Sequence, residues 1–497
     1  MDWAHFFHIY QPADQKPDIL EAVVATSYRP LLEGFLRFKN IRATLNITGS
    51  LLELFDKHDY TDLIDLLREL GREGRIEFTG SAKYHSFLPL LPEQEITRQI
   101  AINSESNKFF LGDAFHPRGF FPPEMAYDPK LVPIVEGLGF QWIILDEIAL
   151  SGAGEPLDFT KRYCIKGSKL QAVFRERRLS NLIVGSIART PATLLAATQE
   201  DREVERYAVT AMDGEVFGHH QPGLEKVLFE MFAMPEFRWR TISDLEQLYP
   251  EVREIHPVTS TWASSQLDID RGVQFLSWQD PDNEIHALQW EFLHSVLKAL
   301  HAVPESDSHF KDLRVQMDQA LASDQFWWAS AKPWWSVEMI EQGAHRLLEI
   351  AKAIPTASPT SIAFAEHCYQ QIVARAFDWQ RTRRVEGTIS EHRKIQQIPF
   401  QDRTLGKGGA EEGVYHAFVA MMKDLEQKAA GAGEYEHAIL WRDAIHKLEQ
   451  KHDIYDAVSA VDLLRTKLPH ELVEKTIEEY KKKYLHIRGG QPEKRGE

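Results

Sequence analysis

The chain has few cysteines and no long apolar run. Cys164 and Cys368 are the only two cysteines among 497 residues, too few for a disulfide framework. No uninterrupted apolar stretch approaches the roughly 18 residues that a membrane-spanning helix needs. The first residues, MDWAHFFHIYQP, also lack the cationic and apolar regions of a secretory signal. We therefore expect a cytoplasmic protein that does not enter a membrane.

Positive charge is scarce as well. Lys and Arg number 57 against 74 Asp and Glu, which gives a formal net charge of −17. Nucleic acids and anionic membranes attract basic surfaces, so this balance argues against both as partners. A neutral or cationic partner fits better. The acidic excess lies almost wholly in the first 400 residues, because the remainder is close to neutral.

Tryptophan, by contrast, is abundant, with 12 in the chain. A Trp ring suits burial in a core, which is the commoner role for any single Trp, but it also suits stacking on the C–H faces of sugar rings. Eight of the 12 lie close together in the sequence: Trp239, Trp262, Trp278, Trp290, Trp327, Trp328, Trp334 and Trp335.

Short apolar runs alternate with longer amphipathic segments from residue 1 to about 285. This alternation is typical of β/α units, and seven predicted strands favour an α/β fold built on a parallel sheet or barrel. The predicted strands are residues 3–10, 43–48, 75–80, 118–123, 141–147, 182–187 and 206–213. Helices are predicted between them, at 51–70, 131–139 and 224–234 among others.

The rest of the chain reads as helical. Residues 286–400 carry apolar side chains at helical spacing and predict a helical domain that completes the cleft of a catalytic barrel at 1–285. A Gly-rich linker begins the last segment, 401–497, which predicts two further helical stretches.

Part of this tail, EYEHAILWRDAIHKLEQ at 434–450, resembles the UVR motif, a short helical hairpin that mediates protein contacts in nucleotide-excision repair proteins. An ordinary amphipathic hairpin is the alternative. The resemblance implies a possible protein partner for the tail, while the oligomeric state is left open.

Polar residues follow almost every predicted strand. In parallel sheets and barrels the working groups lie where strands end, at the carboxyl edge, so these residues are the candidates for chemistry. Those singled out are His8, Tyr10, Gln11, Glu77, His85, Glu124, Asp146, Arg175, Arg177, Asp213, Glu215, His219 and His220.

Two of these segments carry the strongest signals. In PPEMAYDP, two prolines fix the backbone just before Glu124, as a precisely positioned carboxylate requires. In DGEVFGHHQPG, Asp213 and Glu215 stand beside His219 and His220. Two acids and two histidines also suit a metal, but the usual ligand spacings are missing, so no metal or other cofactor is predicted.

A pair of carboxylates from different strand ends is the apparatus for cleaving glycosidic bonds. One attacks the anomeric carbon, and the other, with a raised pKa, protonates the leaving oxygen. Arginines and histidines would donate hydrogen bonds to sugar hydroxyls, and Trp262, Trp278 and Trp328 would stack on sugar rings.

Four ordered segments resemble the first four signature regions of glycoside hydrolase family 57. They are FHIYQP at 7–12, GRIEF at 74–78, GFFPPEMAYDP at 119–129 and AMDGEVFGHH at 211–220; WASSQLDIDRGVQFLSWQDPDN at 262–283 is similar to the region that completes the set. SDQFWWASAKPWWS and the helix after it also resemble the helical portion of such enzymes.

The resemblance implies a distorted (β/α)7 barrel followed by a helical domain, acting with retention on α-glucans or related α-glycosides. By position in the motifs, Glu124 matches the family's nucleophile and Asp213 its acid/base. His8, Gln11, Glu77 and His220 match positions that line the sugar site. One departure is Tyr10, which stands where the family often has a second His; a Tyr donates one hydrogen bond but does not titrate near neutral pH.

Three functions remain in competition. The first is a retaining α-glycosidase or α-glucanotransferase, with hydrolysis, transfer and branching undecided because all pass through one glycosyl-enzyme. The second is a metal-dependent polysaccharide deacetylase or mannosidase on a similar barrel. The third is a non-catalytic, carbohydrate-sensing scaffold whose tail recruits a partner.

Overall fold

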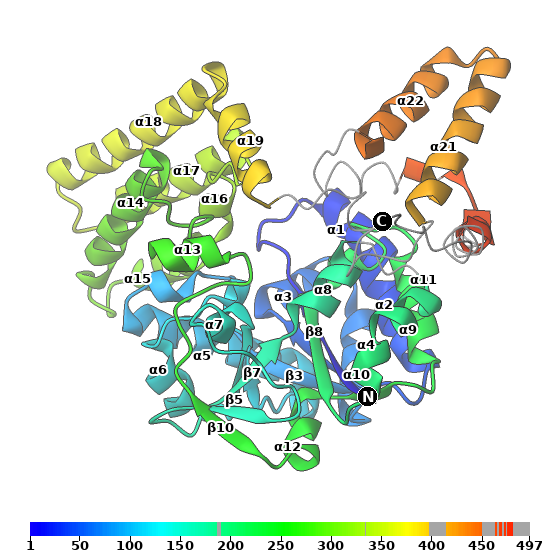
Figure 1. Cartoon of the computed structure of the whole chain (residues 1–497). Helices are drawn as coiled ribbons and strands as arrows, with labels where there is room; N and C mark the ends of the chain where they lie inside the picture. Colours follow the sequence, from blue (N-terminus) through cyan, green and yellow to red (C-terminus); the bar gives the residue numbers. More distant parts are fainter. Residues whose placement is uncertain are drawn as a thin grey trace, which may run out of the picture.

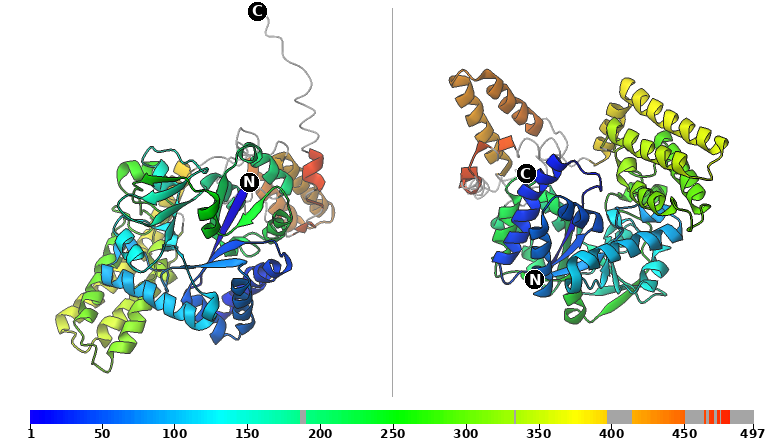
Figure 2. Two further views of the ribbon diagram at one scale, coloured as in Figure 1. Left: turned by 90° about the horizontal axis from the view of Figure 1, so that it is seen from below. Right: turned by 180° about the vertical axis from the view of Figure 1, so that it is seen from behind.

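The computed structural model of the chain describes residues 1–185, 190–332, 334–396 and 414–449, together with 463–464, 467–469, 472–473 and 475–480. Figure 1 shows three parts: an α/β body, a group of helices that follows it, and a hairpin of two helices. Figure 2 gives the same elements from below and from behind.

A curled sheet forms the centre of the α/β body. Its strand order is β10-β6-β7-β5-β4-β3-β2-β1-β8, with β9 beside β1, and every pairing is parallel except that of β6 with β7. The strands are β1 (Asp2–Ile9), β2 (Ala43–Ile47), β3 (Ile76–Gly80), β4 (Gly119–Phe120), β5 (Trp142–Asp146), β6 (Arg162–Ile165), β7 (Gln171–Arg175), β8 (Tyr207–Asp213), β9 (Arg238–Arg240) and β10 (Val252–Ile255).

The sheet curls until β7 meets β8. The backbone N–H of Glu176, directly after β7, donates to the carbonyl of Val209 in β8 at 2.8 Å. Strands β1 to β5, β7 and β8 thus surround one apolar interior, which contains Phe6, Phe121 and Ile144 among others. The α/β barrel expected from the alternating pattern is confirmed.

Helices cover the outside of this barrel (Figure 1). They are α1 (Pro17–Val23), α2 (Arg29–Arg37), α3 (Gly49–Lys57), α4 (Thr61–Arg72), α5 (Glu93–Leu111), α6 (Leu131–Gly137), α7 (Ile148–Ser151), α8 (Arg177–Val184), α9 (Pro191–Ala197), α10 (Gln199–Arg202), α11 (Leu224–Phe232), α12 (Leu245–Leu248) and α13 (Gln266–Arg271).

Two local predictions were wrong. Residues 182–187 were predicted as a strand, but Leu182 and Ile183 lie in helix α8, and the strand of this unit is β7, which was missed. A six-residue apolar run does not distinguish a strand from one buried turn of helix, and Leu179 with Ile183 forms the buried stripe that a helix needs. The single helix predicted over 51–70 is two, α3 and α4.

The helices after the barrel are α14 (Glu284–His301), α15 (Phe310–Ala320), α16 (Asp324–Trp327), α17 (Val337–Ala353), α18 (Pro359–Arg381) and α19 (Arg384–Gln396), called here the helical layer. Its apolar core is continuous with that of the barrel, because Phe120 and Ile143 belong to the same buried cluster as Leu293 and Leu347. The side chain of Asn283 accepts hydrogen bonds from the first free N–H groups of α14 and so begins that helix.

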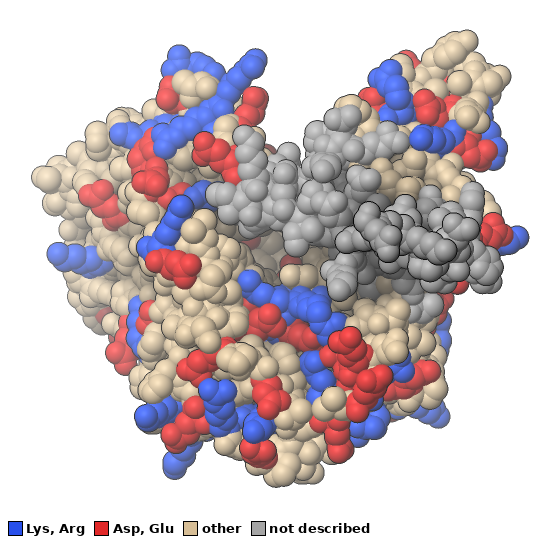
Figure 3. All heavy atoms as spheres, viewed as in Figure 1, with Lys and Arg blue, Asp and Glu red and all other residues tan. Residues whose placement is uncertain are grey.

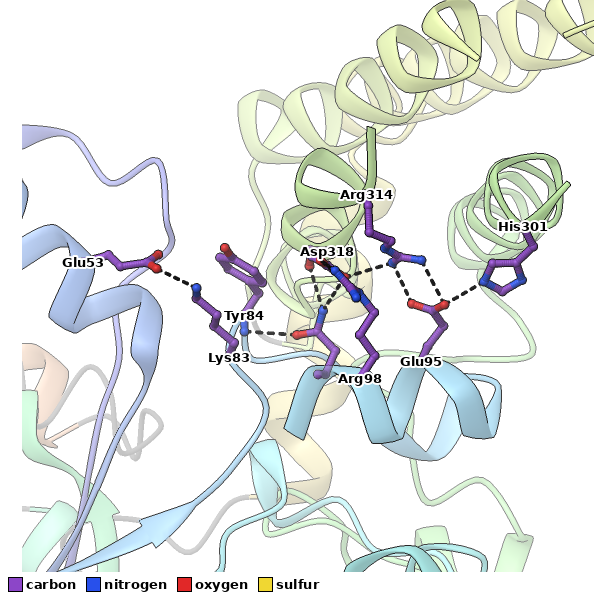
Figure 4. A network of polar contacts seen from close by, with 9 residues as sticks. Glu53, Lys83, Tyr84, Glu95, Arg98, His301, Arg314 and Asp318 are labelled. Carbon is purple, nitrogen blue, oxygen red and sulfur yellow. Dashed lines mark hydrogen bonds and ion pairs between the residues drawn. The ribbon is translucent and has the colours of Figure 1, made fainter. Parts of the chain in front are cut away.

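A buried polar junction also joins the helical layer to the barrel. Glu95 and Arg98 of α5 form ion pairs with Arg314 and Asp318 of α15 (Figure 4). Glu95, Arg314 and Asp318 are each at most 6% exposed. Such charges are stable in a core only where they are paired, so this junction fixes how α15 lies on α5.

The tail contains α21 (Val414–Gly431) and α22 (Tyr435–Glu449), which pack as a hairpin around Phe418, Met422 and Trp441. This agrees with the helical hairpin expected there. On α22, Tyr435 and Ile439 are exposed. That the hairpin is a UVR-type contact module stays a prediction, and the predicted linker over 401–413 lies outside the described residues.

Charges of both signs are intermingled over the face drawn in Figure 3, without a broad basic area among the coloured residues. Among the described residues, no helix is long and apolar enough to cross a membrane.

Candidate active site

The carboxyl ends of the barrel strands bring most of the predicted residues together. His8 is paired in register with Asp213 across β1 and β8, and Asp146 with Arg175 across β5 and β7. Parallel strands end at one edge, so these four side chains lie at the same end of the barrel. Glu124 follows β4 at that end.

The backbone at Glu124 is in a conformation that residues with side chains seldom adopt. Its φ is +62°, and Met125 follows with a φ of +47°. The preceding prolines, Pro122 and Pro123, stiffen the approach. Left-handed backbone at a non-glycine residue costs of the order of 1 kcal/mol and is typical of functional sites. Here it turns the Glu124 carboxyl into the site.

The Glu124 carboxyl has a donor on one oxygen and a neutral ring near the other. The indole N–H of Trp262 donates to Oε2 at 2.8 Å, and Nδ1 of His85 lies 3.9 Å from Oε1. Burial and the negative charge of Asp213 raise the pKa of Glu124 to about 8, although the Trp262 hydrogen bond opposes the shift. Glu124 and Asp213 are therefore close enough to affect each other's ionisation.

Asp213 and Glu215 add two more carboxyls to the same space. Burial raises the pKa of Asp213 to about 6, against the attraction of Arg175. Burial and Asp213 raise the pKa of Glu215 to about 8. Glu215 accepts hydrogen bonds from the Tyr28 hydroxyl and from Nε2 of Gln11 at 3.3 Å. Burial and the charge of Asp213 thus favour the protonated forms of Glu124 and Glu215 at neutral pH, whereas Asp213 is the first of the three to ionise.

Two neutral histidines line the same space. Burial lowers the pKa of His8 to about 4, and burial together with His8 lowers the pKa of His85 well below its usual value. The Asn46 amide N–H donates to Thr79, so its oxygen accepts from Nδ1 of His8 at 2.8 Å. Nε2 of His8 must then accept from Nε2 of His85, 3.1 Å away.

This fixes the other nitrogen of His85 as an acceptor, and the Ser323 hydroxyl lies 3.1 Å from it. The ring of Tyr10 stacks on His85, with centroids 4.4 Å apart, and its hydroxyl donates to Asp324 at 2.9 Å. Ser323 and Asp324 both come from the helical layer, which therefore supplies part of the site.

A second group of charged residues lies behind the Trp262 loop and holds its backbone in place. Arg175 donates to Asp146 at 2.9 Å and to the carbonyl of Ala211 at 2.8 Å. Arg177 also pairs with Asp146 and donates to the carbonyl of Trp262 at 3.1 Å. These contacts hold β5, β7, β8 and the Trp262 loop in one arrangement, so the two arginines position other groups and use most of their own donors in doing so.

Some predicted residues do not join this group. Glu77 faces the barrel interior near the opposite end, where Ser243 and Thr44 donate to it. Glu77 was expected at the sugar site because GRIEF at 74–78 resembles a family signature region. Trp278 is only 1% exposed and stacks on Phe87, so it is a core residue and not a surface for sugar rings.

The remaining predicted site residues, His219, His220 and Trp328, lie at the margin of this group of side chains. Nδ1 of His219 is hydrogen-bonded to the Thr26 hydroxyl at 3.0 Å, and the backbone N–H of His220 donates to the carbonyl of Glu215 at 2.7 Å. Trp328 is partly exposed and packs edge to face on Trp327 at 5.0 Å. The structure does not join these side chains to Glu124, and their contact with a sugar stays a prediction.

Sequence reasoning missed Tyr28, Asn46, Ser323 and Asp324. The last two lie in SDQFWW, within the segment that resembles the helical portion of the family. An acid two positions before three consecutive aromatic residues was a usable signal. Among the residues that the structure describes, no group of three or more His, Cys, Asp or Glu side chains is placed to hold a metal ion.

The site thus combines two carboxyls that hold protons near neutral pH, Glu124 and Glu215, with a third, Asp213, that ionises near pH 6. It can donate a proton from one carboxyl while another acts as a nucleophile or base. The neutral histidines and Tyr10 offer hydrogen bonds to an uncharged, hydroxyl-bearing molecule without adding charge.

Known proteins match this chain in sequence. Residues 4–251 match the model of Glycosyl hydrolase family 57. The alpha-amylase of Pyrococcus horikoshii is 28% identical over 241 residues, which is 48% of this chain and 37% of that protein. The 4-alpha-glucanotransferase of Thermococcus kodakarensis is 27% identical over 240 residues, 48% of this chain and 36% of that protein. The matched region thus spans little more than a third of these relatives.

Solved structures share the fold. The 4-alpha-glucanotransferase from Thermococcus litoralis superposes with a TM-score of 0.57 at 18% identity, over 71% of this chain and 58% of that one. A branching enzyme from Thermococcus kodakaraensis has a TM-score of 0.56 at 16% identity, over 76% and 96% of the two chains. The second comparison extends the shared fold beyond the barrel into the helical layer.

Proposed function

Residues 4–251 of this chain belong to glycosyl hydrolase family 57, and from this premise we propose that it is a retaining enzyme that cleaves α-glucosidic bonds in α-glucans. Glu124 would be the nucleophile and Asp213 the general acid and base. The observation that carries the proposal is the placement of these two carboxyls, which come from different strand ends and lie close enough in one buried space for Asp213 to raise the pKa of Glu124.

The first step would form a covalent intermediate. Oε1 of Glu124 attacks the anomeric carbon, since Oε2 is engaged by Trp262. The bond from that carbon to the glycosidic oxygen breaks, and Asp213 gives its proton to the departing oxygen. The raised pKa of Asp213 supports this role, because a carboxyl that is still protonated near pH 6 has a proton to give.

The second step would release the glycosyl group. Asp213, now ionised, takes a proton from water or from a sugar hydroxyl, whose oxygen attacks the anomeric carbon and frees the Glu124 carboxylate. Water gives hydrolysis, and a sugar hydroxyl gives transfer. The balance depends on which of the two reaches the intermediate.

The ionisation of Glu124 requires an explanation, because the nucleophile must be a carboxylate when it attacks. The Trp262 hydrogen bond favours the ionised form, whereas burial and Asp213 disfavour it. The two carboxyls share protons, and the productive state has one proton between them, on Asp213. Positive charge that develops on the sugar ring stabilises the Glu124 carboxylate further.

The proposed division of labour places catalysis in residues 1–285 and completion of the cleft in 286–400. The contact between Tyr10 and Asp324 supports it, because one partner comes from each region. His8, Gln11, His85 and Tyr10 would bind the sugar at the reaction centre, and Trp328 would contact a neighbouring ring.

Two variants test the catalytic pair. Glu124→Gln and Asp213→Asn should each reduce cleavage of maltoheptaose by about a thousand-fold or more while the far-UV circular dichroism stays that of the parent. Azide should restore turnover to Glu124→Ala by acting as a substitute nucleophile. Rates close to those of the parent in either variant would overturn the assignment.

Product analysis then decides between hydrolysis and transfer. Maltoheptaose products longer than seven units would mean transfer, short products alone would mean hydrolysis, and a new linkage would mean branching. A parent enzyme without activity on any α-glucan would overturn the proposed substrate.

A further inference from the structure

We propose that Gln99 and Asp318, which lie outside the site, are positioning residues that set the places of His85 and Asp324 within it. The inference rests on the proposed function for its kinetic part only. It comes from the buried junction between α5 and α15, whose contacts are drawn in Figure 4.

Gln99 is a fully buried side chain that connects two segments of the site. Its Oε1 accepts from the backbone N–H of Tyr84 at 3.3 Å, directly before His85. Its Nε2 donates to the carbonyl of Asp318 at 3.2 Å and lies 3.4 Å from the Asp318 carboxylate. One amide therefore fixes the distance between the loop that carries His85 and the end of α15.

That loop depends on such support, because its backbone is strained. His85 has a φ of +54°, in the left-handed region that a residue with a side chain occupies only when its surroundings enforce it. The carbonyl of Gln99 adds a second contact, since it accepts from the backbone N–H of Lys83 at 3.2 Å. Gln99 thus contacts both residues that precede His85.

Asp318 is held at the other side of the junction by two guanidinium groups. Arg98 donates to it through Nε at 2.9 Å and through its terminal nitrogen at 2.7 Å. Arg314 donates to it at 3.0 Å. A two-pronged contact of this kind fixes orientation as well as distance, so the last turn of α15 cannot rotate without breaking it.

Only a short piece of chain separates Asp318 from the site. The backbone N–H of Ser323 donates to the carbonyl of His85 at 3.2 Å, and Ser86 pairs with Ala322 as an isolated bridge. The loop that carries His85 and the turn that carries Ser323 and Asp324 are therefore neighbours. Gln99 and Asp318 connect the same two segments through their own hydrogen bonds.

Glu95, at the other end of the junction, makes no such connection to the loop of His85 or to the turn of Ser323. Glu95 accepts two bonds from Arg314, at 3.0 and 2.7 Å, and one from His301 at 2.7 Å. It contacts neither segment of the site. Glu95 lies one turn before Gln99 on the same helix and is equally buried, so it offers a matched control for the effects of disturbing this core.

The experiment compares Gln99→Leu with Glu95→Gln in the full chain. Gln99→Leu should lower kcat on maltoheptaose by about 10- to 100-fold with KM changed by less than about three-fold, because misplaced groups act on the transition state. Glu95→Gln should keep kcat within about three-fold of the parent, since Gln still accepts from Arg314. Thermal unfolding of both variants reports the shared loss of stability.

A double variant tests whether Gln99 acts through His85. In a His85→Ala background, Gln99→Leu should cost less in kcat than it costs in the parent, because one of the two groups that it positions is already gone. Fully multiplicative losses would overturn this route. Gln99→Glu, which keeps the acceptor for Tyr84 but repels Asp318, gives a second variant with the expected loss should Gln99→Leu fail to fold.

Hydrogen exchange gives a readout that needs no activity. Peptides covering 82–88 and 320–328 should exchange faster in Gln99→Leu than in the parent, while Glu95→Gln leaves them unchanged. Equal exchange in all three proteins would overturn the inference. An inactive parent with faster exchange in Gln99→Leu would overturn the proposed function alone.

Discussion

The indole N–H of Trp262 donates to Oε2 of Glu124 across 2.8 Å, and the two residues are 138 positions apart in the sequence. The same loop is tied to the barrel a second time, because the backbone N–H of Trp262 donates to the carbonyl of Glu124 at 3.2 Å. A carboxylate held by a fixed donor is favoured over the neutral acid.

Replacement of Trp262 should therefore raise the pKa of Glu124 above about 8. In Trp262→Phe, less of the enzyme carries an ionised Glu124 beside a protonated Asp213, so kcat should fall about 10- to 100-fold, as expected for loss of a hydrogen bond to a charged group. The alkaline limb of the pH profile should move to higher pH. Trp335→Phe, which lies in the helical layer, serves as the control, and an unmoved limb would contradict this account.

The pH dependence of the parent enzyme should be bell-shaped. Activity needs one proton on the Glu124–Asp213 pair, so it should rise through pH 6 and fall through pH 8, the values to which burial raises the two carboxyls. The measurement is kcat/KM against pH on maltoheptaose. A profile still rising above pH 9 would show that the pair does not control the rate.

Glu215 should behave differently from Glu124 although both have a pKa of about 8. Glu215 remains protonated at neutral pH, where a Gln side chain resembles it in shape and keeps an oxygen for Tyr28 and Gln11. Glu215→Gln should thus keep at least about a tenth of the activity at pH 6 to 7. It should also retain less of its maximum above pH 8, because ionised Glu215 in the parent favours the proton on Asp213 and a Gln side chain does not. Loss of activity as complete as in Glu124→Gln would contradict this prediction.

Much of the site could be predicted because it is built from strand ends. His8, Glu124 and Asp213 each follow an apolar run, and parallel strands end at one edge, so local patterns were enough to group them. How far along the barrel axis an inward residue lies cannot be read from such local patterns, because the alternation along a strand shows only which face of the sheet a side chain lies on. Glu77 was assigned to the sugar site because GRIEF resembles a family signature region, and the structure places it by Ser243.

Groups that arrive from distant segments could not be predicted in this way. Asp324 reaches Tyr10 only because α15 lies on α5, an arrangement in which Asp318 of α15 is held by Arg98 of α5, 220 residues away in the sequence. Likewise, nothing in the composition distinguishes Trp262 from Trp278. One meets a carboxylate and the other fills a core, and this depends on which residues face each ring after folding.

Tyr10 and Asp324 give a direct test of how the helical layer contributes. Tyr10→Phe removes the hydroxyl that donates to Asp324 at 2.9 Å and leaves that buried carboxyl with one donor fewer. Since the Tyr10 bond lowers the pKa of Asp324 against the effect of burial, its loss should raise that pKa further. We expect kcat/KM to fall by about 10-fold.

The control for this prediction is the same change in an Asp324→Asn background. There the charge is already gone, so Tyr10→Phe should cost much less. An equal loss in both backgrounds would mean that Tyr10 acts through His85, on which its ring stacks, and not through Asp324.

Trp278 should affect stability without affecting binding. It is 1% exposed and packs face to face with Phe87 at 4.9 Å, so Trp278→Ala should lower the free energy of unfolding by about 3–5 kcal/mol. The milder Trp278→Phe should leave KM for maltoheptaose within about two-fold. Denaturant titration and steady-state kinetics measure the two quantities, and a large rise in KM at unchanged stability would restore the sugar-binding role.

Acid stability should depend on Asp2 at the other end of the barrel. Burial raises its pKa, but hydrogen bonds from Arg238, Arg240 and Tyr249 outweigh that effect and lower the pKa to about 2. A carboxyl whose pKa is lower in the folded than in the unfolded chain stabilises the fold above about pH 4, and the contribution is lost as the pH falls toward 2. Because the Arg238 side chain is 51% exposed, solvent screens the pair, and we expect about 1–2 kcal/mol.

Asp2→Asn should accordingly lower the midpoint of urea unfolding at pH 7 and flatten its dependence on pH between about 4 and 2. The control is Asp62→Asn, whose ion pair with Arg29 is half exposed and should matter little. Unfolding followed by tryptophan fluorescence at several pH values makes the comparison. If the two variants lose stability equally at pH 7 and show the same slope in acid, the Asp2 network does not stabilise the barrel in the way its geometry implies.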